Sequence, residues 1–243
     1  MLPAYNAANT LADTVTEIDD AMVEEIILVD DASQDGTAAL AEGVGLVTVR
    51  HARNMGYGGN QKTCYRAALT ANADIVVMLH PDYQYTPKLL PAMVALIDSG
   101  LYDIALGSRI LGKGARRGGM PLYRYVANRF LTFFQNVMLD EKLSEFSTGY
   151  RAFSRQVLEQ LPLAENSDDF LFDNQILAQA IYFDFRIGEV TCPTRYEPHS
   201  SSINVWRWMK YVPGVIWTSM LFLLAKWGFV RPAIFSLGCR RLI

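Results

Sequence analysis

The sequence is short of cysteine and has no surplus of positive charge, and each shortage excludes a class of protein. Its 243 residues include three widely separated cysteines (Cys64, Cys192 and Cys239), with no CxxC pair or Cys/His cluster. We therefore expect neither a disulfide framework nor a structural zinc site, and a reducing compartment fits. The 22 Lys and Arg residues face 25 Asp and Glu residues. This balance argues against a nucleic-acid partner, because phosphate neutralisation needs a basic surplus.

Signal sequences, repeats and low-complexity segments are also missing. Met1 leads directly into a turn-like stretch, LPAYN, in place of the apolar run of a signal peptide. The length suits one domain with a sizeable core, or one domain plus an appendage. We therefore expect a domain over residues 1–198 and an appended segment over residues 199–243.

Charge is distributed unevenly along the chain. All 25 acidic residues lie at or before Glu197, and that part carries a net charge of −9, whereas the remainder carries six basic residues and no acidic one. An acidic body with a basic, aromatic tail is typical of a protein that meets an anionic membrane surface. The alternative is a basic C-terminal helix packed on its own acidic domain.

Apolar runs and helical patterns alternate from residue 25 onward. Strands are expected at 25–30, 46–49, 74–79 and 104–106, and helices at 37–41, 61–71 and 87–99. This alternation predicts an α/β fold with a mostly parallel, doubly wound sheet flanked by helices. Because the chain opens on a turn, we expect either that the true N-terminus lies upstream or that the strand which should precede that turn is missing. Ligands of such sheets bind beyond the carboxyl ends of the strands.

The first polar turn carries two adjacent carboxylates, Asp30 and Asp31, at the end of an apolar strand. They can accept hydrogen bonds from a base ring N–H or a ribose hydroxyl, and adjacent carboxylates repel each other without a partner. We therefore favour a nucleoside contact over helix capping, which Asp35 suits better.

A second turn is rich in glycine. Residues 54–60, NMGYGGN, would let a backbone or a phosphate approach the start of a helix closely, and Lys62 could add a positive charge. The pattern is neither a Walker A nor a GxGxxG motif, so it is weak evidence for phosphate binding.

The strongest chemical signal follows the third expected strand. His80, Asp82 and Gln84 alternate there and would present one nitrogen and two oxygen ligands on the same side. Such a set could bind Mg²⁺ or Mn²⁺ beside a diphosphate. The alternative is that His80 ends the strand and Asp82 caps the next helix.

These motifs together resemble those of the family-2 glycosyltransferases of the GT-A (Rossmann-like) fold, especially the dolichyl-phosphate or polyprenyl-phosphate mannosyltransferase type. The resemblance covers most of the chain and rests on five segments: PAYN (3–6), VDDAS (29–33), HPDYQ (80–84), GSR (107–109) and STGYR (147–151). It implies nucleotide-sugar binding by Pro3, Tyr5, Asp30, Asp31, Arg109 and Arg151, and metal binding by His80, Asp82 and Gln84.

Two positions depart from the family pattern. Ala7 stands where the family commonly has Glu, and His80 stands in place of the first Asp of the metal motif. Imidazole is an acceptable ligand for Mn²⁺ and a poor one for Mg²⁺, so we expect Mn²⁺ to be favoured.

The acceptor side is expected to be basic. Residues 107–129 contain six cations and no acid, and their glycines suggest that the first half is a mobile loop. The resemblance places the start of a helix near Asp173 at the acceptor site. A hydroxyl acceptor would need a carboxylate base there, whereas a lipid phosphate would not. Helix N-capping is the alternative for Asp173. The aromatic helix expected over 123–139 should be mostly core, with some side chains lining a lipid groove.

The tail combines aromatic, basic and apolar residues. Residues 205–210 read VWRWMK, and the apolar stretch 211–225 is broken by Pro213 and ended by Lys226. This is shorter than the roughly 20 residues that a spanning helix needs, so we expect monotopic or re-entrant membrane-associating helices. A hairpin with 229–237, or a helix of a soluble domain, remains an alternative.

The sequence therefore predicts an inverting glycosyltransferase at the cytoplasmic face of the cell membrane. It would transfer a sugar from a nucleotide diphosphate sugar to a polyprenyl phosphate, with Asp82, Arg109 and Asp173 as catalytic residues. One alternative is transfer to a hydroxyl acceptor in envelope glycan or glycolipid synthesis. Another is a catalytically silent nucleotide-sugar binding protein.

Overall fold

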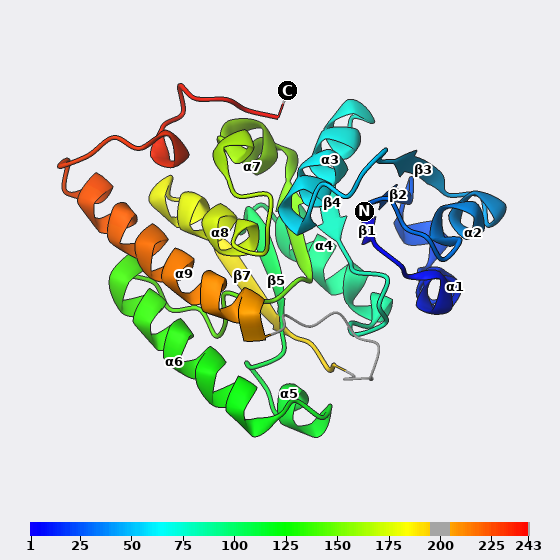
Figure 1. Cartoon of the computed structure of the whole chain (residues 1–243), viewed down its shortest axis with the longest axis horizontal. Coiled ribbons are helices and arrows are strands. Elements are labelled where there is room, and N and C mark those ends of the chain that lie inside the picture. Colours follow the sequence, from blue (N-terminus) through cyan, green and yellow to red (C-terminus); the bar gives the residue numbers. More distant parts are fainter. Residues whose placement is uncertain (195–204, 243) are drawn as a thin grey trace.

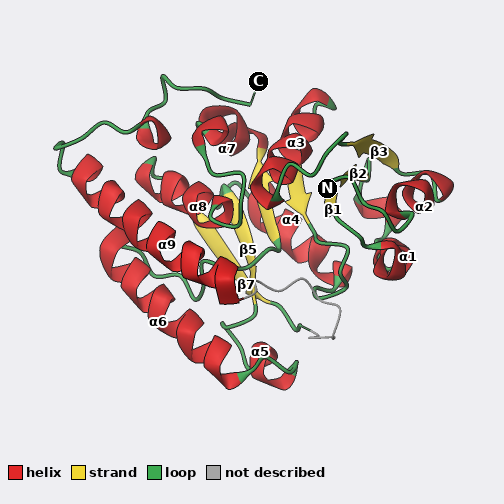
Figure 2. Ribbon diagram, in the orientation of Figure 1, coloured by secondary structure: helices red, strands yellow, loops and turns green. Residues whose placement is uncertain are grey.

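The chain folds as a mixed sheet with helices on both of its faces (Figures 1 and 2). The computed structural model describes residues 1–194 and 205–242, and for 205–208 it describes the backbone only. The expected α/β architecture is confirmed. The boundary expected between residues 198 and 199 lies outside the described residues.

The N-terminal half is a parallel sheet in the order β1-β2-β3, formed by Leu2–Ala4, Ile27–Asp30 and Val47–Arg50. Our expectation of a missing first strand was wrong. Leu2–Ala4 is a short strand in register with Leu28–Asp30, and its three residues are buried. The helices of this half are α1 (Ala8–Thr16), α2 (Thr37–Gly43) and α3 (Tyr57–Thr70).

The second half adds strands in the order β4-β6-β5-β7, formed by Ile75–Met78, Arg151–Ser154, Ile104–Ser108 and Ile187–Thr191. Two hydrogen bonds join the halves: the Met1 nitrogen donates to Val77 O (2.8 Å), and Leu79 N donates to Met1 O (3.1 Å). Strand β1 therefore lies beside β4 with parallel polarity. Of the seven strands in the described residues, β6 alone runs antiparallel to its neighbours.

Alternate strand residues contribute to two separate cores, because successive side chains of a strand point to opposite faces. Val29, Met78 and Leu106 join the core under α3, α7 (Arg155–Gln160) and α8 (Phe172–Tyr182). On the other face, Leu28 and Ala105 pack with α1 and α4 (Leu90–Asp98). This sandwich fixes the carboxyl ends of β1, β2 and β4 along one edge.

The basic stretch after β5 is more ordered than expected. In place of a mobile loop it forms a short helix, α5 (Gly114–Arg117), with Ala115 buried. Gly118 is required there, since a Cβ at this position would lie 1.9 Å from Thr194 O.

The next helix, α6 (Leu122–Leu139), confirms the helical spacing and overturns the expected burial. We expected most of its apolar residues to be core. Instead, Phe130 is 70% exposed and Phe133 is 66% exposed. The reason is that α6 covers the outside of α9 and α8 and turns its polar side chains, such as Thr132 and Gln135, inward.

The tail forms α9 (Val205–Lys226), which continues through Pro213 and packs on α8 and α6 (Figure 1). Val215 and Phe222 of α9 are buried, and Phe222 makes edge contacts with Tyr182 and with Phe235 of the one-turn helix Ala233–Phe235. Within the ranges 1–194 and 205–242, no helix has the length and apolar character needed to cross a bilayer.

Candidate active site

The carboxylates at the end of β2 have different surroundings. Asp31 is fully engaged: it accepts hydrogen bonds from the backbone N–H groups of Met55 (2.7 Å) and Gly56 (3.1 Å), and its Oδ1 lies 2.7 Å from His51 Nδ1. It therefore fastens the 51–56 loop to the sheet. Asp30 is 4% exposed, and only its Oδ2 has a partner, the Ser33 N–H (3.2 Å). Its buried Oδ1 has no hydrogen-bond partner among the described residues.

The opening turn is tied to the turn after β2. Asn6, at φ 52°, donates its N–H to Ser33 Oγ (2.8 Å), and its side-chain oxygen accepts from Gln34 N (3.0 Å). Pro3 lies within β1 and is buried, while Tyr5 is exposed beyond the strand end. Of these two sequence-predicted nucleotide contacts, only Tyr5 therefore presents its ring to solvent.

Asp35 supports the same turn. Partial burial acts to raise the pKa of Asp35, but hydrogen bonds from Thr37 and from the Ala8 N–H outweigh it, so the pKa is lowered overall. This agrees with the local capping role expected for Asp35.

The glycine-rich turn is packed against protein. The N–H groups of Gly58 and Gly59 both donate to Asp168 O, at 2.8 Å and 3.2 Å. A Cβ on Gly58 would lie 2.3 Å from Ser167 O. Lys62 is likewise occupied, since its ammonium group donates to Asp168 Oδ1 at 2.7 Å. The glycines therefore admit the 167–168 backbone, and this turn is not an open phosphate cradle.

Tyr57, at the start of α3, joins two predicted site residues that are distant in sequence. Its hydroxyl donates to Asp173 Oδ2 (2.6 Å) and lies 3.0 Å from His80 Nε2. Because the single hydroxyl proton goes to the carboxylate, the phenol oxygen accepts from an Nε2–H of His80. The Tyr57 ring also stacks on the His80 ring, with centroids 5.4 Å apart.

This arrangement leaves the other nitrogen of His80, Nδ1, without a hydrogen-bond partner in the described part of the chain. Burial lowers the pKa of His80, and the nearby Asp82 opposes that effect. The ring also explains Gly149: a Cβ there would lie 2.6 Å from His80 Cδ2.

The residues expected to bind a metal share one turn after β4. Asp82 Oδ1 accepts from the Gln84 N–H (3.1 Å), Tyr83 between them has φ 57°, and the Gln84 side chain is buried. No cluster of three or more His, Cys, Asp or Glu side chains occurs among residues 1–194 and 205–242. The chain could offer Nδ1 of His80, a carboxylate oxygen and an amide oxygen, which is a donor set that suits Mn²⁺ better than Mg²⁺.

Asp173 does not cap α8, because both its oxygens accept from other elements. Besides Tyr57, Gln61 Nε2 donates to Asp173 Oδ1 (2.9 Å), and Arg151 Nη1 lies 3.6 Å from the same oxygen. Arg151 is 0% exposed and donates to three backbone carbonyls, those of Phe146, Thr148 and Asp173. It therefore fixes the backbone of the 146–151 segment, and its predicted contact with a diphosphate stays a prediction.

Arg109 lies in a second polar network. Its Nη2 donates to Glu145 Oε2 (2.6 Å) and to Ser147 O (3.0 Å), and its backbone N–H donates to Glu145 Oε1 (2.6 Å). The Glu145 side chain is completely buried. A diphosphate contact from Arg109 likewise stays a prediction.

The structure thus brings His80, Arg151 and Asp173 together, and it places Asp30 and Asp31 beside the opening turn. Sequence reasoning missed the connecting Tyr57, although its place between the glycines at a helix start was a usable signal. It also missed Glu145, for which a buried partner of Arg109 has no local sequence signature.

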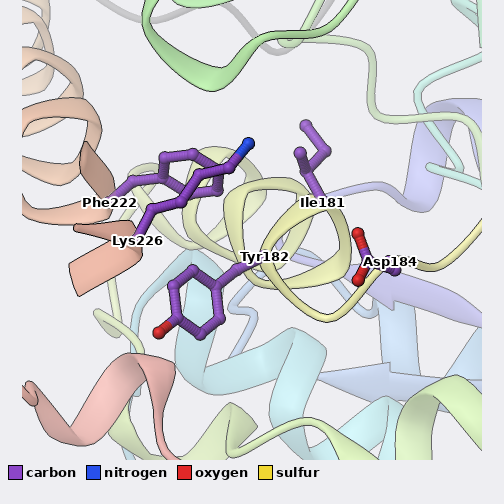
Figure 3. A pocket seen from close by; sticks show the side chains of 5 residues that line it. All are labelled: Ile181, Tyr182, Asp184, Phe222 and Lys226. Atoms are coloured by element: carbon purple, nitrogen blue, oxygen red, sulfur yellow. The ribbon is translucent and has the colours of Figure 1, made fainter. Parts of the chain in front are cut away.

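A pocket lies away from these residues, between α8 and α9. Ile181, Tyr182 and Asp184 at the end of α8 face Phe222 and Lys226 of α9 across a hollow of about 310 Å³ (Figure 3). The Lys226 ammonium lies 5.7 Å from the centre of the Phe222 ring. None of the sequence-predicted site residues lines this hollow.

The polar turns lie at the carboxyl edge of a mostly parallel sheet, where ligands of such folds bind, and comparison with known proteins identifies the family. The model of the family described as Glycosyl transferase family 2 matches residues 1–162. The chain therefore belongs to glycosyl transferase family 2 and is a glycosyltransferase.

Two relatives span most of the chain. The polyprenol monophosphomannose synthase of Mycolicibacterium smegmatis is 27% identical over 236 residues, which cover 94% of this chain and 85% of the relative. The UDP-N-acetylglucosamine--dolichyl-phosphate N-acetylglucosaminyltransferase of Methanococcus voltae is 25% identical over 217 residues, which cover 82% and 86%.

The fold is shared with glucosyl-3-phosphoglycerate synthase of Mycobacterium tuberculosis. That crystal structure has a TM-score of 0.67 at 21% identity and covers 96% of this chain and 81% of its own. A structure of the same synthase with Mn²⁺, UDP-glucose and phosphoglyceric acid has a TM-score of 0.62 at 18% identity, covering 96% and 80%. At these identities the likeness establishes the GT-A-like fold alone.

Proposed function

We propose that the protein transfers a sugar, with inversion, from a nucleotide diphosphate sugar to a polyprenyl phosphate. The acceptor class is supported by two relatives, named for polyprenol and dolichyl phosphates, that span most of this chain. The donor half rests mainly on Asp30, whose buried Oδ1 has no partner among the described residues. A buried carboxylate oxygen without a donor is costly, and a base N–H or ribose hydroxyl would satisfy it.

Asp173 favours a phosphate acceptor over a hydroxyl acceptor. A hydroxyl must lose a proton to a base during transfer, whereas a lipid phosphate oxygen is already anionic. Asp173, the carboxylate expected for that base, is buried, and both its oxygens already accept hydrogen bonds from Tyr57 and Gln61. We therefore infer that Asp173 positions Tyr57 and Arg151 and does not accept a substrate proton.

A divalent metal, with Mn²⁺ favoured, belongs to this proposal. His80 Nδ1, Asp82 and Gln84 would bind it, and the solved synthase that shares the fold was crystallised with Mn²⁺ and UDP-glucose. A bound cation would offset the negative charge that develops on the leaving nucleoside diphosphate. Arg109 and Arg151 would assist by fixing the 145–151 segment beside this site.

We place the reaction at the cytoplasmic face of the cell membrane, with the protein bound peripherally. A polyprenyl phosphate resides in a bilayer, so the enzyme must reach its surface, and the aromatic, basic α9 supports this location.

The test is transfer itself. The full chain is incubated with labelled nucleotide sugars and a polyprenyl phosphate in detergent, and the label is partitioned between organic and aqueous phases. Label in the lipid supports the proposal, label only in a water-soluble glycan supports a hydroxyl acceptor, and binding without turnover indicates a silent binding protein. Asp82→Ala should abolish turnover, and an unchanged rate would refute the metal site.

A binding measurement tests the donor half separately. Asp30→Asn should weaken nucleoside diphosphate binding about tenfold or more, since a hydrogen bond to a charged group contributes about 1.5–3 kcal/mol. Asp13→Asn, on the exposed side of α1, is the matched control and should leave calorimetric affinity unchanged. Equal affinities for the two variants would exclude Asp30 from the nucleoside site.

A further inference from the structure

The outward face of α6 has the reverse of the pattern expected for a surface helix. Every exposed residue of α6 is apolar or aromatic, namely Leu122, Tyr123, Val126, Phe130, Phe133 and Val137. At 100° per residue these six fall within about one-third of the helix circumference and form one continuous stripe. A surface helix in water normally turns its polar residues outward.

Helix α9 also turns apolar residues outward, although its inner side is apolar as well, with Val215 and Phe222 buried. Its exposed residues include Met209, Ile216, Trp217 and Met220, with Trp217 62% exposed. Its hydroxyl residues Thr218 and Ser219 are buried, and Ser219 Oγ donates to Val215 O of the same helix at 2.9 Å.

The two helices lie side by side at the edge of the molecule opposite α1 and α2 (Figure 1). Their C-terminal ends are joined by Lys226 Nζ and Asp140 Oδ2, 3.9 Å apart. The stripe of α6 alone, from Leu122 to Val137, extends about 23 Å along the helix axis. Such an extended apolar surface on two neighbouring helices marks an interaction site.

Charge identifies the partner. No acidic residue occurs in residues 104–139 or in 205–242, whereas exposed cations gather at the N-terminal ends of the two helices. These cations are Lys113, Arg116, Arg117 and Lys210. An apolar, aromatic stripe bordered by cations matches a bilayer surface with anionic headgroups, on which such helices lie in the plane of the interface.

We propose that α6 and α9 together form the face that docks on an anionic membrane, with α6 inserting Phe130 and Phe133. This inference deepens the proposed function, because it specifies the surface that would bring the site to a lipid acceptor. The inner side of α6 already contacts that site: Asn128 Nδ2 donates to Ser147 Oγ (2.8 Å), and Arg129 Nη1 donates to Ser144 O (2.7 Å).

Vesicle flotation of the full chain tests the proposal. Vesicles contain phosphatidylcholine alone or with one-third phosphatidylglycerol, and neither contains a polyprenyl phosphate. The wild type should float with the anionic vesicles and less well with the zwitterionic ones, and added salt should weaken binding. Phe130→Glu/Phe133→Glu should lower the partition coefficient by about a hundredfold or more, since both aromatic side chains would lose their burial in the bilayer.

The matched control is Leu101→Glu, an exposed apolar residue in the turn after α4, which should float like the wild type. Thermal unfolding should be the same for all variants, because the two Phe side chains contact solvent. Flotation of the Phe130/Phe133 variant at the wild-type level would overturn the proposal. The proposal would also be overturned if the wild type did not bind vesicles and instead formed a dimer in light scattering, with the Phe130/Phe133 variant remaining a monomer.

Docking and chemistry can fail independently. Turnover with a short-chain, water-soluble isoprenyl phosphate should survive in the Phe130/Phe133 variant, because this acceptor needs no membrane. Vesicle binding without turnover of either acceptor would leave docking intact and reject the proposed function. Turnover in solution by a wild type that binds no vesicles would support the proposed function and reject the docking face.

Discussion

Substitution of Arg109 can distinguish a structural role of this residue from a role in binding the diphosphate. Its guanidinium group is almost completely buried against Glu145, and the pair exchanges hydrogen bonds of 2.6 Å (Nη2 to Oε2) and 3.2 Å (Nε to Oε1 and Oε2). Asn128 Nδ2 reaches the same carboxylate at 3.4 Å. Replacing Arg109 by Met therefore leaves a buried carboxylate without its main partner.

The expected cost is large because the remaining charge cannot reach water. Removing one member of a buried ion pair lowers the free energy of unfolding by about 3–5 kcal/mol, and we expect Arg109→Met and Glu145→Gln each to fall in this range. Replacing both residues, as Arg109→Met/Glu145→Leu, removes the stranded charge. The loss of unfolding free energy in this double variant should be about 2 kcal/mol smaller than the sum of the losses in the single variants Arg109→Met and Glu145→Leu.

Urea unfolding of these four variants and of the wild type measures the coupling, and calorimetry measures nucleoside diphosphate affinity. The structural interpretation requires a loss of stability with Arg109→Met and a coupling between the two sites. If Arg109→Met kept wild-type stability and lost only donor affinity, Arg109 would be a ligand of the diphosphate and the reasoning above would be wrong.

Three further outcomes follow from local geometry. Gly58→Ala should lower the free energy of unfolding by about 2–3 kcal/mol, since its Cβ would meet backbone atoms. The control Gly43→Ala, whose Cβ meets nothing within 4 Å, should not destabilise the protein. Equal stability of the two variants in urea unfolding would contradict this prediction. Hydrogen bonds from Arg186 lower the pKa of Asp103, so this carboxyl stabilises the fold above its unfolded pKa of about 3.9, and the stabilisation is lost as pH falls through the lower folded value. Asp103→Asn should flatten the thermal stability profile in that acidic window, and an unaltered profile would refute the assignment. His80→Asp should raise turnover with Mg²⁺ relative to Mn²⁺, EDTA should abolish both, and an unchanged ratio would remove His80 from the metal site.

The alternation of apolar runs and turns predicted the α/β class and placed β2, β3, β4 and β5 within two residues of their observed bounds, whereas β6 and β7 were not predicted. The direction of each strand in the sheet was harder to predict. Strand β6 follows a long excursion through α5 and α6, and its antiparallel insertion between β4 and β5 depends on tertiary packing that no local pattern encodes. The three-residue β1 was missed because a strand this short has no periodicity.

The candidate site shows the same division. Residue types and their order predicted that His80, Asp82 and the Asp30–Asp31 pair follow the carboxyl ends of strands, and the structure has them there. The partners of their atoms could not be predicted, because they come from elements distant in sequence. Asp31 and Asp30 are adjacent, similarly buried carboxylates. The loop at 51–56 donates to Asp31, whereas the buried Oδ1 of Asp30 has no hydrogen-bond partner among the described residues.

The boundary between acidic and basic parts differs between the sequence and the folded surface of this protein. Counted along the chain, α6 belongs to the acidic body and α9 to the basic tail. In the structure the two helices are neighbours and share outward apolar stripes, and neither contains an acidic residue. Helical spacing predicted the helix and could not reveal which way its apolar residues face, because a core stripe and a membrane stripe have the same period. The decisive signal for α6 lies on its inner side, where Thr132 and Gln135 are buried while its apolar stripe faces outward. Helix α9 buries Thr218 and Ser219 as well, together with the apolar Val215 and Phe222.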